Sequence, residues 1–118
     1  MIINMPYIDT KTSAIITKDQ KDRLIKEFGA AIELIPGKSE EWLMLNFDGG
    51  CRMAFRGISD VPCAMIDVQI FGKTTDQAYD ALTERICAII NDILEIPSDR
   101  IYVKYTEKDR WGYNGFNF

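Results

Sequence analysis

The sequence repeats one pattern twice, and this repeat limits the folds open to the chain. In the first half, an extended segment at 6–12 is followed by a helical pattern and by a second extended segment at 42–47. In the second half, an apolar strand pattern at 63–71 precedes another helical pattern, and a last strand pattern covers 101–105. Each half is typical of a β-α-β unit, whose crossover is right-handed. Two such units predict an α+β, two-layer fold: a four-stranded mixed sheet with two helices on one face.

Both helices are indicated by apolar residues that recur at helical spacing. Thr17 is placed to cap the first helix, and Pro36-Gly37 is placed to stop it. Its expected core-facing stripe comprises Leu24, Ile25, Phe28, Ala31, Ile32 and Ile35. The second helix is expected to open at 72–77 and to end at 96–99. Its expected stripe comprises Ala78, Leu82, Ile86, Ile89 and Ile93.

The strand patterns leave one face of this sheet without a cover. The longest strand pattern alternates, so that its aliphatic residues share the face under the helices while Asp67 and Gln69 point the other way. That other face still carries apolar and aromatic residues, namely Tyr7, Met44, Met65, Phe71 and Tyr102. A monomer would expose a sizeable apolar patch there, which favours a closed homo-oligomer. The alternative is an amphiphilic sheet face in contact with water.

Composition excludes several classes of function. The 118 residues carry a net charge of −4, which suits one domain and disfavours binding to nucleic acid. The chain has no histidine, so histidine-based catalysis and histidine-ligated zinc are excluded. Three cysteines, Cys51, Cys63 and Cys87, form no C-x-x-C pair, and we expect reduced thiols, no metal and no cofactor. Without a signal peptide or a membrane-spanning run, the expectation is a cytoplasmic protein with no membrane partner; secretion by another route is left open.

Short motifs in a fixed order along the repeat carry a family resemblance. They are Met5-Pro6-Tyr7-Ile8, Ile35-Pro36-Gly37-Lys38, Pro62-Cys63-Ala64, Phe71-Gly72-Lys73, Pro97-Ser98-Asp99-Arg100-Ile101-Tyr102-Val103 and Gly112-Tyr113-Asn114. With these motifs the chain resembles the macrophage migration inhibitory factor family of the tautomerase superfamily, above all its microbial members. The resemblance implies a homotrimeric, tautomerase-like barrel with a site at each subunit interface. It also implies cofactor-independent keto–enol conversion of phenylpyruvate-like aromatic 2-keto acids.

The resemblance implies that Pro6 is the catalytic base, exposed as an N-terminal amine. Residues 1–5 would then be an N-terminal extension that is removed, and 6–118 the tautomerase-like domain. The chemistry needs a base that is neutral at the working pH. Burial lowers the pKa of an amine by penalising its charged form, so a ring amine can serve without histidine. If residues 1–5 are retained, the Pro6 nitrogen is an amide and cannot act as a base. The alternative is a proline that opens an edge strand.

The same resemblance implies roles for seven further residues. Lys38 would bind the substrate carboxylate, the alternative being a solvated turn lysine. The expected substrate-binding residues are Phe71, Tyr102, Lys104, Tyr113, Phe118 and Trp42. Tyr102 would come from the neighbouring subunit, and Lys104, which shares its strand face, replaces an asparagine of the animal members and is a candidate for the pocket. For the aromatic residues, the alternative is packing in the core or at an interface.

Two functions from different classes remain open on the sequence. The first is the phenylpyruvate tautomerase just described, an isomerase. The second is a cytokine-like trimer that binds a protein partner and keeps only vestigial tautomerase activity. The acidic surface and the aromatic tail at 111–118 are compatible with both.

Overall fold

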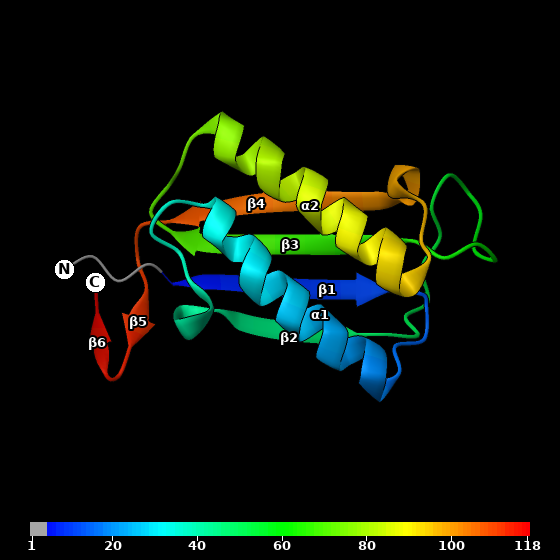
Figure 1. The fold of residues 1–118 in the computed structure, drawn as a ribbon, viewed down its shortest axis with the longest axis horizontal. Helices are drawn as coiled ribbons and strands as arrows, with labels where there is room; N and C mark the ends of the chain where they lie inside the picture. The colour runs from blue at the N-terminus through cyan, green and yellow to red at the C-terminus, as the bar shows by residue number, and fades with distance from the viewer. Residues whose placement is uncertain (1–4) are drawn as a thin grey trace.

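The sheet has the mixed topology that the repeat predicts. In the computed structural model, which describes residues 5–118, the four main strands are β1 (Pro6–Thr12), β2 (Met44–Asp48), β3 (Ala64–Phe71) and β4 (Ile101–Lys108). They lie in the order β2-β1-β3-β4 (Figure 1). The strands within each repeat, β1 with β2 and β3 with β4, are parallel, whereas β1 and β3 are antiparallel. The two β-α-β units therefore join side by side through their first strands.

Two helices, α1 (Lys18–Ala31) and α2 (Asp76–Leu94), cover one face of this sheet (Figure 1). Thr17 caps α1 in a reciprocal capping box with Gln20, as its sequence position predicts. The expected core stripes are buried, with one exception. Ile25 is 41% exposed, because it lies about 100° around the helix from the buried Leu24 and so turns toward solvent.

The second extended segment begins later than the sequence pattern suggests. Short 3₁₀ turns occupy Ile32–Leu34 (η1) and Glu40–Trp42 (η2), and the strand starts only at Met44. The Trp42 N–H donates to Ser39 O and the Leu43 N–H donates to Glu40 O, so these residues form a tight turn. Trp42 was expected in the strand and instead stands before it, beside the sheet edge.

One buried side chain makes four hydrogen bonds to the segment between β2 and β3. Arg100, at the end of the 3₁₀ turn Ser98–Arg100 (η3), is only 7% exposed and donates to four backbone carbonyls of this segment. The segment extends beyond the sheet as the dark green loop of Figure 1. Four carbonyls of its irregular backbone are thus satisfied by a guanidinium, and backbone bonds such as that between Phe55 and Ile58 satisfy others.

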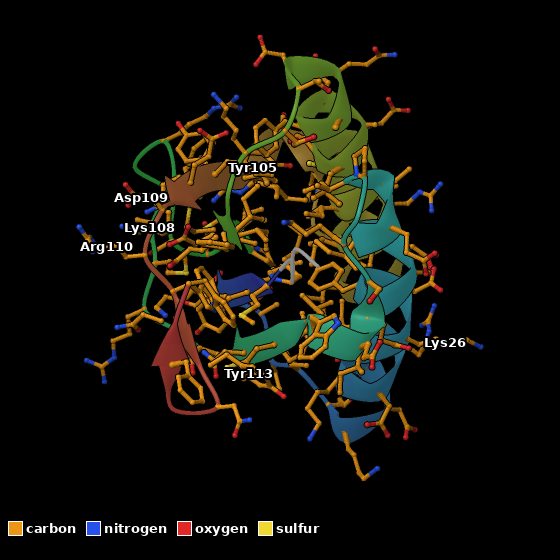
Figure 2. The ribbon with its side chains drawn as sticks, turned by 90° about the vertical axis from the view of Figure 1, so that its left-hand side faces the viewer. Lys26, Tyr105, Lys108, Asp109, Arg110 and Tyr113 are labelled. Atoms are coloured by element: carbon orange, nitrogen blue, oxygen red, sulfur yellow. The ribbon has the colours of Figure 1, made fainter. Side chains whose placement is uncertain are left out.

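The C-terminal residues form a small hairpin of β5 (Gly112–Tyr113) and β6 (Phe116–Asn117). Asn114 and Gly115 connect them with φ angles of 52° and 86°, the left-handed conformation that a two-residue hairpin turn requires. The hairpin lies on the side of the sheet away from the helices (Figure 2). The aromatic tail therefore lies beyond the end of the sheet, beside the start of β1 (Figure 1).

Two absences concern the described part of the chain. Among residues 5–118, no helix has the length and apolar character that crossing a bilayer demands. Within the same residues, no group of cysteine and acidic side chains is arranged to hold a metal ion. The expected extension 1–5 lies outside the described residues, except for Met5.

Candidate functional site

Pro6 lies at the end of the sheet where β1 begins and β3 ends. Because these two strands are antiparallel, Pro6 pairs with Ile70, and Phe71 lies one residue beyond. The parallel strand β2 begins at the same end of the sheet, with Met44 opposite Tyr7. This end lies beside the β5–β6 hairpin in Figure 1. Backbone pairing alone thus brings the start of the first repeat against the end of the third strand.

A cavity of about 550 Å³ opens at this end of the sheet. Its lining comes from β1, β2, β3, η2, the hairpin and residues adjacent to them: Met5, Pro6, Tyr7, Glu41, Trp42, Leu43, Met44, Gln69, Trp111, Gly112 and Tyr113. The rings of Trp42 and Tyr113 meet edge to face, with centroids 5.2 Å apart and planes at 88°. Figure 2 looks onto this end of the sheet and shows Tyr113 on the hairpin. Three sequence-predicted residues, Pro6, Trp42 and Tyr113, therefore share one cavity.

Lys38 is buried close to Pro6. Its side chain, in a residue only 6% exposed, donates from Nζ to Phe71 O at 3.1 Å. It forms no ion pair with any carboxylate of residues 5–118. Burial lowers the pKa of Lys38 below its ordinary value, because a desolvated ammonium is penalised. A buried ammonium that faces only a neutral carbonyl has the chemistry to bind an anion.

Met5 and Phe71 complete the backbone around Pro6. The Phe71 N–H donates to Met5 O at 3.3 Å, and Met5 is itself only 4% exposed. The Phe71 ring lies on the open face of β3, 6.0 Å from the ring of Phe118. Phe71 thus links Lys38, through its carbonyl, to the residue that precedes Pro6, through its N–H.

Tyr102 and Lys104 do not reach this cavity within one chain. Tyr102 is 58% exposed at the start of β4, and its partner Met65 pairs in turn with Lys11, at the far end of β1 from Pro6. It packs edge to face on Phe55, with centroids 5.1 Å apart. Lys104 lies on the open face, with Nζ 3.5 Å from Asp67 Oδ2. One chain therefore assembles only part of the predicted residue set.

Comparisons with known proteins agree with this architecture. The family model described as "Macrophage migration inhibitory factor (MIF)" matches residues 5–118. The chain belongs to the macrophage migration inhibitory factor family. The family's homologue from Brugia malayi is 26% identical over 116 residues, covering 97% of this chain and 99% of the relative. The family's protein from Xenopus laevis is also 26% identical, with the same coverage.

Solved structures of the family have the same fold as this chain. The MIF2 protein of Leishmania major superposes with a TM-score of 0.90 at 30% identity, covering 97% of each chain. The homologue from Prochlorococcus marinus superposes with a TM-score of 0.82 at 28% identity, covering 95% of this chain and 98% of the other. The sequence resemblance to microbial members of the family is confirmed.

Several residues of this family member's cavity are missing from the sequence-based site. Glu41, Trp111 and Gln69 line the cavity but were not predicted as site residues. Trp111 lies in the aromatic tail, which signals a cavity wall only once the tail is seen to fold back. Gln69 points away from the helix-covered face, as its alternation predicts. Glu41 carries no signal in the sequence, because its place follows from the 3₁₀ turn that replaces the expected strand.

Proposed function

We propose that this protein is a cofactor-independent keto–enol tautomerase of phenylpyruvate-like 2-keto acids, acting in the cytoplasm. Its base is the Pro6 nitrogen, freed by removal of residues 1–5. The observation that carries the proposal is the buried Lys38 ammonium, bonded to Phe71, whose N–H bonds the residue before Pro6, together with a cavity at Pro6 that aromatic rings line. The reaction transfers one proton from carbon 3 of the substrate to the base and returns one to the carbonyl oxygen, so it needs no cofactor.

Pro6 suits the base because of its burial and its ring. A free α-amine has a pKa of about 7.7–8.0, and a secondary amine lies higher in solution. Pro6 is buried at the cavity, and desolvation there would lower this pKa toward neutrality. While Met5 remains attached, the nitrogen is an amide whose lone pair is delocalised into the carbonyl. The active form is therefore the chain that begins at Pro6.

Removal of Met5 would also make room for the substrate. In the present chain the Met5 carbonyl oxygen accepts the Phe71 N–H. Without Met5 this N–H loses its partner, and a substrate oxygen at the same place would restore the hydrogen bond. Lys38 bonds the carbonyl oxygen of the same residue, Phe71, so the ammonium and the N–H together suit a carboxylate. The aryl group then extends toward Trp42 and Tyr113.

The proposed assembly is a homotrimer in which a neighbouring chain completes the site. Support comes from the open sheet face and its edges, where Tyr102 and Met44 are 58% and 68% exposed. Tyr102 stands at the wrong end of the sheet to serve Pro6 of its own chain. Sedimentation velocity is the test: we expect a species of three times the 13.5 kDa chain mass, and a monomer would contradict the proposal.

The base is tested by comparing two forms of one sequence. We expect the chain that begins at Pro6 to enolise phenylpyruvate at least about 10²-fold faster than the chain that keeps residues 1–5, since only the former has a free amine. In the shorter chain, Pro6→Gly should lower kcat by about 10²-fold. Equal turnover by a chain whose intact mass includes Met5 would remove Pro6 from the role of base.

The anion receptor is tested separately. Lys38→Met should raise KM for phenylpyruvate by about 10-fold or more, because a charge-assisted hydrogen bond to the carboxylate is lost. Lys73→Met is the matched control, since Lys73 is an exposed lysine. An unchanged KM in Lys38→Met would place the substrate carboxylate elsewhere.

A further inference from the structure

We propose that Glu41 makes this cavity selective for ligands that carry a carboxylate at one end and a positive charge at the other. In terms of the proposed reaction, the preferred substrates are 2-keto acids whose aryl group bears a cationic substituent such as an ammonium. The inference rests on the proposed function only in identifying the cavity as the substrate pocket; the binding preference itself does not depend on turnover.

The first observation is the set of rings that line the same cavity as Glu41, an exposed residue at its rim. Trp42, its neighbour in η2, meets Tyr113 of the hairpin at 88°, and Trp111 lines the same cavity. Aromatic rings at right angles offer a cation the electron-rich face of at least one ring. A carboxylate on the lining of the same cavity adds a charge of the opposite sign to that of the cation. This combination of groups recognises alkylammonium ions better than neutral or anionic groups of the same shape.

The second observation is that the Glu41 carboxylate has no partner within residues 5–118. It takes part in none of the ion pairs of this part of the chain, although basic side chains pair with acidic ones elsewhere on its surface. Of the residues that line the cavity, Glu41 alone carries a carboxyl side chain. A free carboxylate here would repel an aryl group bearing a negative charge and attract one bearing a positive charge.

The third observation is the position of Lys38 relative to Glu41. Lys38 contacts Phe71, which contacts the backbone immediately before Pro6, whereas Glu41 lies in the turn that bears Trp42. Glu41 lines the cavity directly, whereas Lys38 is connected to its lining through Phe71 and Met5. With its carboxylate at Lys38, a ligand directs its far end toward the aromatic wall. Selectivity then depends on the charge at that far end.

Binding can be measured without turnover, because the chain has two tryptophans and both, Trp42 and Trp111, line the cavity. Quenching of tryptophan fluorescence therefore reports ligand binding at this place. Three inert acids serve as probes: 4-(aminomethyl)phenylacetate, its neutral counterpart 4-methylphenylacetate, and the dianion 4-carboxyphenylacetate. We expect the wild-type chain to bind the cationic probe about 5- to 20-fold more tightly than the neutral one, and the dianion most weakly.

The variants separate charge from shape. Glu41→Gln keeps the size of the side chain and should reduce the preference for the cationic probe to about threefold or less, leaving the neutral probe unchanged. Glu41→Lys should reverse the order, so that 4-carboxyphenylacetate binds more tightly than 4-(aminomethyl)phenylacetate. Glu33→Gln, at an exposed residue of the turn η1, is the matched control and should bind all three probes as the wild type does.

Two results would overturn the inference. One is equal affinity of the wild-type chain for the cationic and neutral probes, and the other is an unchanged ratio in Glu41→Gln. The wild-type chain and all variants in this comparison begin at Pro6, so that retention of residues 1–5 does not enter it. If the probes show the expected order but phenylpyruvate is not enolised, the tautomerase proposal fails and the selectivity of the cavity stands. If phenylpyruvate is enolised but the cationic probe is not preferred, the proposed selectivity fails and the tautomerase proposal stands.

Discussion

Replacement of Arg100 by methionine should cost this chain more stability than any other single change of a charged side chain. The Arg100 guanidinium donates to the carbonyls of Phe55, Ile58, Val61 and Pro62 at 2.9–3.2 Å. It also stacks near the Phe55 ring, with Cζ 5.4 Å from the centroid. Methionine has a similar length but donates no hydrogen bond. The four carbonyls would then have to find water or leave their places.

The magnitude follows from these four bonds. A hydrogen bond to a charged group contributes about 1.5–3 kcal/mol, but contributions within one network do not add. The loop can also move to let water reach some of the carbonyls. We therefore expect a loss of about 3–4 kcal/mol in the free energy of unfolding, at the upper end for single substitutions. For a chain of this length that corresponds to a fall in Tm of about 10–20 °C.

Arg56 provides the matched control for this prediction. Its guanidinium lies over the same Phe55 ring, at 5.1 Å, but its side chain is 60% exposed and pairs only with Asp99, at 3.6 Å. Arg56→Met should cost about 0.5 kcal/mol or less. Since both arginines stack on one ring, the difference between the two variants isolates the carbonyl bonds. Thermal and urea unfolding of both variants give the two free energies.

The reasoning has a clear point of failure. If Arg100→Met unfolds within 1 kcal/mol of the wild type, as Arg56→Met should, the four carbonyl bonds do not hold the loop. Arg100→Lys adds a further check, because an ammonium keeps the charge but cannot span four carbonyls. Its loss should lie between those of the other two variants.

Two further predictions concern ionisable groups near the sheet. Burial lowers the pKa of Lys38 below 10.5. Between the folded pKa and 10.5 the unfolded chain binds more protons than the folded chain, so the free energy of unfolding rises with pH there. Lys38→Met should lack this rise in pH-dependent urea melts, and its free energy of unfolding at pH 7 should be higher by up to about 1 kcal/mol. Burial alone would raise the pKa of Asp9, but hydrogen bonds from Asn46 and Lys11 outweigh it and lower the pKa below 3.8. Asn46→Ala should therefore cost about 1 kcal/mol at pH 7, and the deficit should shrink as pH falls below 3.8 and Asp9 is protonated; a constant deficit would show that the hydrogen bond does not favour the charged form.

Much of the fold could be predicted because its signals are local and periodic. Alternation in β3 and the helical stripes of α1 and α2 each indicate one face, and the repeat doubles the information. The errors arose where a local pattern competes with a turn. Residues 42–47 alternate as a strand does, yet Trp42 belongs to a 3₁₀ turn fixed by backbone hydrogen bonds. Ile25 was counted in the stripe although it lies at its margin.

The candidate site was predictable only in part, since it is assembled by tertiary contacts. Pro6 and Lys38 could be predicted from family motifs, and the structure places both at one end of the sheet. Trp42 and Tyr113 were predicted singly, but their perpendicular contact depends on how the hairpin folds back. Glu41 has no periodicity or motif that marks it. Its inclusion depends on the turn that the strand pattern concealed.

The repeat itself explains why one chain holds an incomplete residue set. Because β1 and β3 are antiparallel, the start of β1 and the end of β3 meet at one end of the sheet, which brings Phe71 to Pro6. Because β4 is parallel to β3, its start lies at the opposite end of the sheet, and Tyr102 is level with Lys11. Five residues of strand separate that level from Pro6, about 16 Å. No side-chain movement spans this distance, so any role of Tyr102 at Pro6 requires a second copy of the chain, and the proposals of trimer and composite site stand or fall together.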